Sequence, residues 1–68
     1  MLAKNVKYLR KKNGYTFRAL ASKCNISTRS IKAIEDRITT NPTIKIVDSL
    51  AKGFEVTIDD LIHKDLQN

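Results

Sequence analysis

Cysteine is almost absent from this chain of 68 residues, where Cys24 is the only one. A lone cysteine excludes an internal disulfide and any zinc site built on several thiolates. Cys24 lies between apolar positions at helical spacing, so we expect a small buried thiol in a protein of a reducing cytosol.

Long apolar runs and clusters of reactive side chains are also missing. No apolar stretch approaches ~18 residues, so we expect neither a membrane span nor a signal peptide. His63 has no second His or Cys at ligand spacing, the serines have no His–acid partner, and there is no Gly-rich phosphate loop. We therefore expect no metal, no cofactor, no small-molecule ligand and no enzymatic activity.

Acidic residues are scarce in the first half of the chain. Residues 1–37 hold ten Lys or Arg and two acids, a net charge of +8, whereas residues 38–68 carry a net charge of −2. The first half is therefore suited to a polyanion such as nucleic acid, although charge alone leaves open an ordinary solvated basic face.

The apolar residues recur at helical spacing, and strand signals are weak. Leu2, Val6 and Leu9 predict a first helix. A hydroxyl residue follows one apolar residue and precedes another by four positions at Thr16, Ser27 and Thr57. This is the pattern of a helix cap with a hydrophobic staple, so each hydroxyl residue marks the start of a helix. Pro42-Thr43 marks the start of a fourth helix. We predict an all-α fold with helices at about 2–12, 16–23, 27–36, 43–53 and 57–64. The predicted core is Leu2, Val6, Leu9, Tyr15, Leu20, Ala21, Cys24, Ile26, Ile31, Ile34, Val47, Leu50, Ala51, Val56, Leu61 and Ile62.

The second and third predicted helices are joined by only Cys24-Asn25-Ile26. Asn25 is suited to a left-handed turn, and small Ala21 lies where the helices must approach, so residues 16–36 describe a helix-turn-helix. The N-terminal end of its second helix projects outward, where base edges and phosphates can pair with the side chains of residues 27–29.

These pieces resemble the Cro/CI-type (lambda-repressor-like, XRE) helix-turn-helix family of phage repressors and bacterial regulators. The resemblance is carried over residues 4–62 by "VKYLRKKNGYT", "LASKCNIS", "SIKAIED" and "NPTIKIVDSLAKGFEVTIDDL". It implies one compact five-helix domain over residues 1–68. It also implies a second helix that straddles the DNA backbone and a third that lies in the major groove, usually as a dimer on a pseudo-palindromic operator.

The resemblance also implies roles for individual residues. Base contacts would come from Ser27, Thr28, Arg29, Lys32 and Ala33, and backbone contacts from Thr16, Phe17, Arg37, Thr39, Thr40, Asn41 and Thr43. Arg10 and Glu35 fall on positions that in some members form a partly buried ion pair. Lys7, Lys11, Lys12, Arg18 and Lys23 would add mainly long-range attraction. For Arg29 and Thr28 a phosphate contact or a solvated surface position remains the alternative, and residues 37–43 are otherwise an ordinary polar loop.

The sequence departs from the family pattern at three places. Phe17 stands where the family usually has Gln, and it either covers a sugar or a thymine methyl or folds back onto the core. Arg37, preceded by Asp36, stands where a glycine commonly follows the third helix. Near the end of the fourth helix a small residue, an apolar one and Gly are replaced by Gly53-Phe54-Glu55, so we expect this helix to end at Gly53 with Phe54 packed below it.

These features favour a phage Cro/CI-like repressor that binds double-stranded operator DNA as a dimer in the cytoplasm of a bacterial or phage-infected cell. The chain ends just after the fifth predicted helix, which favours the short, Cro-like form. A weak or DNA-assembled dimer would form around residues 53–62, with Ile58 as the contact. A restriction–modification controller or an antitoxin-type regulator is an alternative, and so is a basic protein-interaction module.

Overall fold

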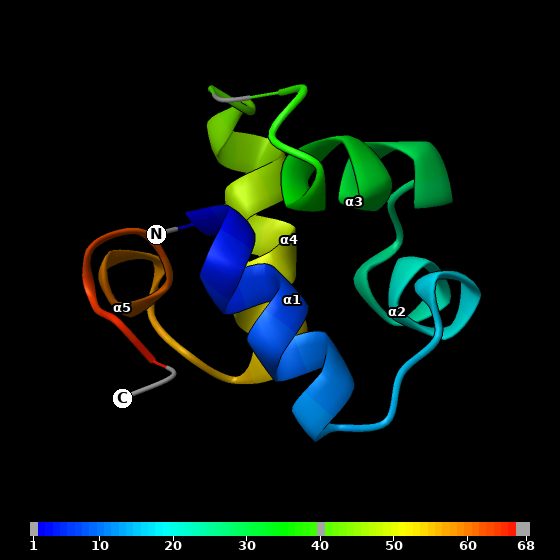
Figure 1. Cartoon of the computed structure of the whole chain (residues 1–68), viewed down its shortest axis with the longest axis horizontal. Helices are drawn as coiled ribbons and strands as arrows, with labels where there is room; N and C mark the ends of the chain where they lie inside the picture. Colours follow the sequence, from blue (N-terminus) through cyan, green and yellow to red (C-terminus); the bar gives the residue numbers. More distant parts are fainter. Residues whose placement is uncertain (1, 40, 67–68) are drawn as a thin grey trace.

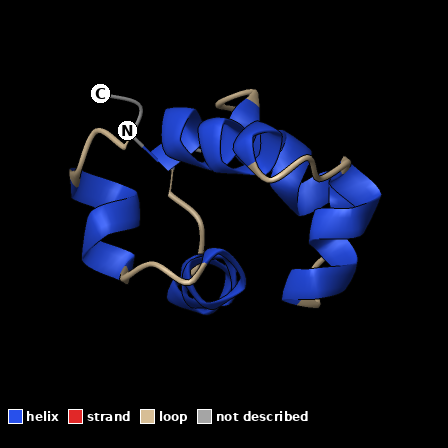
Figure 2. Ribbon diagram, turned by 90° about the horizontal axis from the view of Figure 1, so that it is seen from below, coloured by secondary structure: helices blue, strands red, loops and turns tan. Residues whose placement is uncertain are grey.

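The computed structural model describes residues 2–39 and 41–66, and this part of the chain consists of five helices and their loops (Figure 2). The helices are α1 (Leu2–Lys12), α2 (Phe17–Cys24), α3 (Thr28–Glu35), α4 (Ile44–Phe54) and α5 (Ile58–His63). The predicted all-α fold is confirmed, with ends that differ by about one residue. None of the helices in the described residues is long and apolar enough to span a membrane.

The hydroxyl residues predicted as caps begin four of these helices. The side-chain oxygens of Thr16, Ser27, Thr43 and Thr57 accept the backbone N–H three residues later, at 3.0, 3.1, 3.3 and 3.0 Å. Each bond satisfies an N–H that the helix itself leaves unpaired, and a cap of this kind contributes about 1 kcal/mol. The starts of α2 to α5 are therefore determined locally.

The helices enclose a single apolar cluster. In Figure 1, α1 and α4 lie in the middle of the molecule, α2 and α3 on one side and α5 on the other. α3 packs on α1 and α2, α2 also packs on α4, and α5 packs on α1 and α4. The buried apolar residues are Val6, Leu9, Leu20, Ala21, Cys24, Ile31, Ile34, Val47, Leu50, Ala51, Phe54 and Leu61.

The predicted core needs two additions and one adjustment. Phe54 belongs to the core, because α4 continues one residue past Gly53 and carries the ring inward. Asn5 is completely buried, which the apolar pattern did not indicate. Five predicted core residues are only half-buried and pack at its edge: Leu2, Tyr15, Ile26, Val56 and Ile62.

Gly53 and Cys24 form the close contact between α4 and α2. A Cβ atom at Gly53 would overlap Sγ of Cys24, so the missing side chain allows the helices to approach. Cys24 is a buried thiol, as predicted, and burial raises its pKa although the charge of Lys23 opposes the rise. The thiol is therefore a packing group in its protonated form.

Within residues 2–39 and 41–66, three non-glycine residues have a left-handed backbone: Asn25 (φ 56°), Arg37 (φ 60°) and Glu55 (φ 60°). Asn25 has the turn conformation that the sequence predicted. Arg37 and Glu55 occupy the two positions where the family pattern commonly has glycine. Residues with a Cβ pay a conformational cost in this region, which glycine avoids.

Replacing Glu55 with glycine should stabilise the protein. Glu55 ends α4 in the left-handed conformation and its side chain is exposed, so the change removes strain without removing a core contact. We expect the free energy of unfolding to rise by about 0.5–1 kcal/mol, measured by urea denaturation. Glu55→Ala is the matched control, because it keeps the Cβ and should leave stability nearly unchanged; an equal gain in both variants would contradict the backbone explanation.

Candidate nucleic-acid interface

The turn between α2 and α3 is held by backbone hydrogen bonds. The Asn25 N–H bonds to the carbonyls of Ala21 and Ser22, and Ile26 N–H donates to Ala21 O at 3.0 Å. Ile31 and Ile34 bury the inner face of α3. The outer face of α3 is therefore presented by two helices whose relative orientation is fixed.

The residues predicted to read bases lie on this outer face. Thr28, Arg29 and Lys32 are exposed, and Ala33 is half-buried. Ser27 is also exposed, but its hydroxyl already accepts Ser30 N–H and lies 2.9 Å from Ser30 Oγ. No described segment of the chain covers this corner, and base contact by all five residues stays a prediction.

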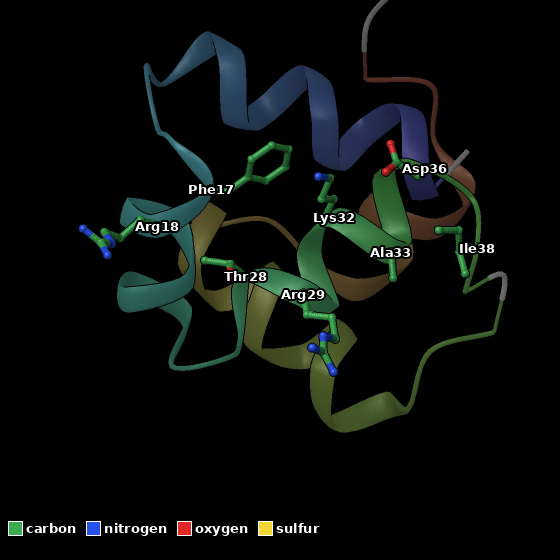
Figure 3. Close-up of a pocket in the computed structure, with 8 residues that line it drawn as sticks. All are labelled: Phe17, Arg18, Thr28, Arg29, Lys32, Ala33, Asp36 and Ile38. Atoms are coloured by element: carbon green, nitrogen blue, oxygen red, sulfur yellow. The ribbon is translucent and has the colours of Figure 1, made fainter.

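An open groove of about 690 Å³ runs beside α3 (Figure 3). Four of the five predicted base-contacting residues line it: Thr28, Arg29, Lys32 and Ala33. The rest of the lining is Phe17 together with three residues that the sequence did not place there: Arg18, Asp36 and Ile38. Arg18 and Arg29 point outward in Figure 3, whereas the ring of Phe17 points toward α1. The groove thus combines three cations with an apolar floor.

Behind the groove, Arg10 of α1 ties three parts of the molecule together. Its guanidinium donates from Nε to Glu35 Oε2 (2.7 Å), from Nη2 to Glu35 Oε1 (3.1 Å) and from Nη1 to the Tyr15 carbonyl (3.1 Å). The Arg10 and Glu35 side chains are 13% and 4% exposed, so the pair is largely shielded from water. The hydrogen bond to Glu35 is the main reason that the pKa of Arg10 is raised, and the guanidinium stays protonated.

The ring of Phe17 packs against the Arg10 guanidinium. Cζ of Arg10 lies 4.2 Å from the centre of the Phe17 ring, and the ring is half-buried and packs against the core. The sequence left open whether Phe17 covers a sugar or thymine methyl or folds back onto the core, and the structure has the contact with the core. Because Phe17 also lines the groove, part of the ring remains available to a ligand.

The residues predicted to contact the DNA backbone are more scattered. Thr16, Arg37, Thr39, Asn41 and Thr43 are exposed and lie outside the groove lining, and Thr40 lies outside the described residues. Thr16 and Thr43 use their hydroxyls as helix caps. Their contacts with DNA stay predictions.

Three residues of the groove were not predicted from the sequence to lie there. Arg18 was assigned only long-range attraction. Its position next to Phe17 at the start of α2 could have indicated that it lines the groove. Asp36 was named only as the residue that precedes Arg37, and it stands at the end of the groove. Ile38 lies in a loop and had no periodic pattern to mark it.

Ile58 is a different case from the groove residues. It was predicted as the dimer contact, but it is half-buried and packs against the core from the start of α5. Only part of the side chain is therefore available for a dimer contact, which stays a prediction.

The chain is similar in sequence to known helix-turn-helix proteins. A helix-turn-helix family model matches residues 6–61. The HTH-type transcriptional regulator SinR of Bacillus licheniformis is 27% identical over 64 residues, which are 94% of this chain and 58% of SinR. SinR of Bacillus subtilis (strain 168) is 27% identical over 62 residues, 91% of this chain and 56% of SinR. The chain therefore spans little more than half the length of the curated relatives it matches.

Two solved structures have the same fold. The crystal structure of SinR, described as the master regulator for biofilm formation, in complex with DNA superposes with a TM-score of 0.85 and 27% identity, covering 91% of this chain and 98% of that chain. A complex of the SinR and SinI proteins gives a TM-score of 0.87 and 25% identity, covering 98% of this chain and 65% of that chain.

Proposed function

The chain belongs to the helix-turn-helix family, in its Cro/CI-type (XRE) branch, and from this membership we propose that it is a sequence-specific DNA-binding transcriptional regulator. In this proposal α3 enters the major groove and α2 lies across the sugar–phosphate backbone. The observation that carries it is the outer face of α3, where exposed Thr28, Arg29 and Lys32 border an uncovered groove. The DNA in the solved SinR complex supports the choice of ligand.

The finer assignment is a repressor of the phage Cro/CI type that binds a pseudo-palindromic operator as a dimer and blocks polymerase. A restriction–modification controller or antitoxin-type regulator would use the same interface, and a neighbouring methylase or toxin gene would identify it. In either role the protein works in the cytoplasm, where the DNA is, and catalysis forms no part of the proposal.

Selection of bound duplexes from a random pool tests the function. The expected result is one preferred sequence made of two related half-sites, whose centres are about 34–36 Å or one helical turn apart. A selected site with a single half would remove the dimer from the proposal. Failure to enrich any sequence, at a salt concentration low enough for non-specific binding, would argue against sequence-specific recognition.

Arg29 is the residue that we expect to carry base specificity. Its exposed guanidinium can donate two hydrogen bonds to O6 and N7 of guanine, a contact worth about 1–3 kcal/mol of discrimination. Arg29→Ala should relax base preference at one position of each half-site, measured by competition between single-base variants of the selected duplex. An equal loss of affinity on all sequences would mean that Arg29 contacts only phosphate.

Lys32→Ala is a companion variant. Besides the base contact proposed for it, the Lys32 ammonium neutralises phosphate charge, so its loss should weaken binding to all duplexes and reduce the log–log salt slope by about 0.9. Lys52→Ala is the matched cation control. Lys52 pairs with Asp48 on α4 at 3.1 Å and does not line the groove, so this variant should leave both slope and specificity unchanged.

A protein partner is a second candidate ligand. The solved complex of SinR with SinI has the fold of this chain and contains a protein bound to that regulator. In this chain the basic groove would then receive an acidic protein. Tight binding to a protein, without retention of any operator-like duplex at low salt, would favour this second function.

A further inference from the structure

We infer that the groove beside α3 recognises the 5-methyl groups of thymine, through an apolar surface formed by Ala33 and Ile38. The inference rests on the proposed function and specifies which chemical feature of the duplex the groove selects. It concerns the apolar part of the lining, which hydrogen bonding and charge do not explain.

Ile38 is the first observation. The residue is 78% exposed. It is one of two large apolar residues with such exposure in the described part of the chain, the other being Ile44 at 69%. An exposed isoleucine on a loop contributes little to the core, and it loses unfavourable contact with water only when a ligand covers it. Ile38 lines the same groove as the charged residues of α3.

Ala33 is the second observation. It is the small residue on the outer face of α3, between Lys32 and the end of the helix, and it is half-buried. A methyl group here allows the backbone of α3 to approach a ligand closely, and it adds an apolar contact point between Ile38 and Phe17. Ile38 N–H donates to the Ala33 carbonyl at 2.9 Å, so these two residues contribute neighbouring apolar surface to the groove.

The charge around this floor indicates the occupant. Arg18, Arg29 and Lys32 contribute three positive charges to the lining, against one negative charge from Asp36. A ligand that fits must therefore combine apolar groups with negative charge close by. The major groove of DNA has this arrangement, because the thymine methyl is its apolar feature and phosphates flank it on both sides.

The test uses duplexes in which single thymines of the selected site are replaced by deoxyuridine. This change removes the 5-methyl group and keeps every hydrogen-bonding atom of the base. We expect affinity to fall about fourfold at one or two positions of each half-site, the factor that corresponds to about 0.8 kcal/mol for one buried methyl group. Fluorescence anisotropy titration at constant salt measures the ratio.

Two protein variants assign the effect to the groove. Ile38→Ser should bring the thymine-to-uracil affinity ratio close to one, because the surface that covers the methyl is lost. Ile44→Ser removes the other exposed isoleucine, which does not line the groove, and should keep the fourfold ratio. Both side chains are exposed, so both variants should fold, and thermal melting checks that they do.

The outcomes separate the inference from the proposed function. Tight binding to the selected duplex with equal affinity for every uracil-substituted form would overturn the inference and leave the function standing. A ratio unchanged by Ile38→Ser, or lost equally in Ile44→Ser, would overturn it as well. Absence of binding to any duplex would remove the proposed function itself.

Discussion

Replacing Asn5 with alanine should lower the free energy of unfolding by about 3 kcal/mol, a large part of the stability of a domain this small. Asn5 is completely buried in α1. Its Nδ2 donates to the carbonyls of Leu61 (2.8 Å) and Lys64 (2.6 Å), and its Oδ1 accepts the N–H of Leu66 at 3.1 Å. One side chain therefore satisfies three backbone groups at the end of the chain.

The loss has two sources. Alanine leaves these backbone groups without their partner, and an unsatisfied buried group costs about 1–3 kcal/mol unless water reaches it. The smaller side chain also leaves a cavity between α1 and α5. Urea denaturation measures the loss, and hydrogen exchange should show faster opening of α5 than of α3.

Asn13→Ala is the matched control for this prediction. Asn13 also donates from Nδ2 to a carbonyl, that of Leu9 at 2.7 Å, but it is exposed and the bond is local, between the residue after α1 and the last turn of that helix. Its removal should cost less than about 1 kcal/mol. Similar losses in the two variants would contradict the role assigned to burial at Asn5.

Removing the carboxylate of Glu35 should also destabilise the protein by about 3 kcal/mol, and it should weaken DNA binding in addition. Glu35→Ala leaves the Arg10 guanidinium in a largely buried position without its counter-charge. Glu35 is the last residue of α3, so the ion pair also fixes how this helix lies against α1. Denaturation measures the first effect, and anisotropy titration of the folded variant measures the second.

The double variant Arg10→Met, Glu35→Leu distinguishes a buried charge from a general loss of packing. Two apolar side chains of similar size remove both charges together, so most of the stability lost in Glu35→Ala should return. Recovery should be incomplete, because Arg10 also donates to the Tyr15 carbonyl and stacks on Phe17. A double variant as unstable as Glu35→Ala would show that the electrostatic explanation is wrong.

A structural feature was predictable from the sequence when the residues that form it lie close together along the chain. The caps at Thr16, Ser27, Thr43 and Thr57 were predictable, because a cap needs only a hydroxyl and a backbone N–H three residues away. The left-handed turn at Asn25 was predictable for the same reason. The apolar face of each helix followed from the helical period.

The parts of the site that the sequence did not predict are those assembled from different elements. Ile38 comes from a loop and lines the same groove as Ala33 of α3 and Phe17 of α2. Phe17 had two open alternatives, and its position was decided by Arg10, which comes from α1. The resemblance to the family indicated α3 as the reading helix, but the groove has an apolar floor because side chains distant in the sequence converge there.

The amino-acid sequence by itself determined the five helices, their starting points, the helix-turn-helix and the concentration of positive charge in residues 1–37. These features depend on neighbours within about one helical turn, or on composition. Only the tertiary structure decided that Asn5 is buried and bonded to residues 61–66, and that Arg18, Ala33 and Ile38 share one groove. Such contacts depend on how whole helices pack, and packing is set by the shapes of all the buried faces together rather than by any one segment.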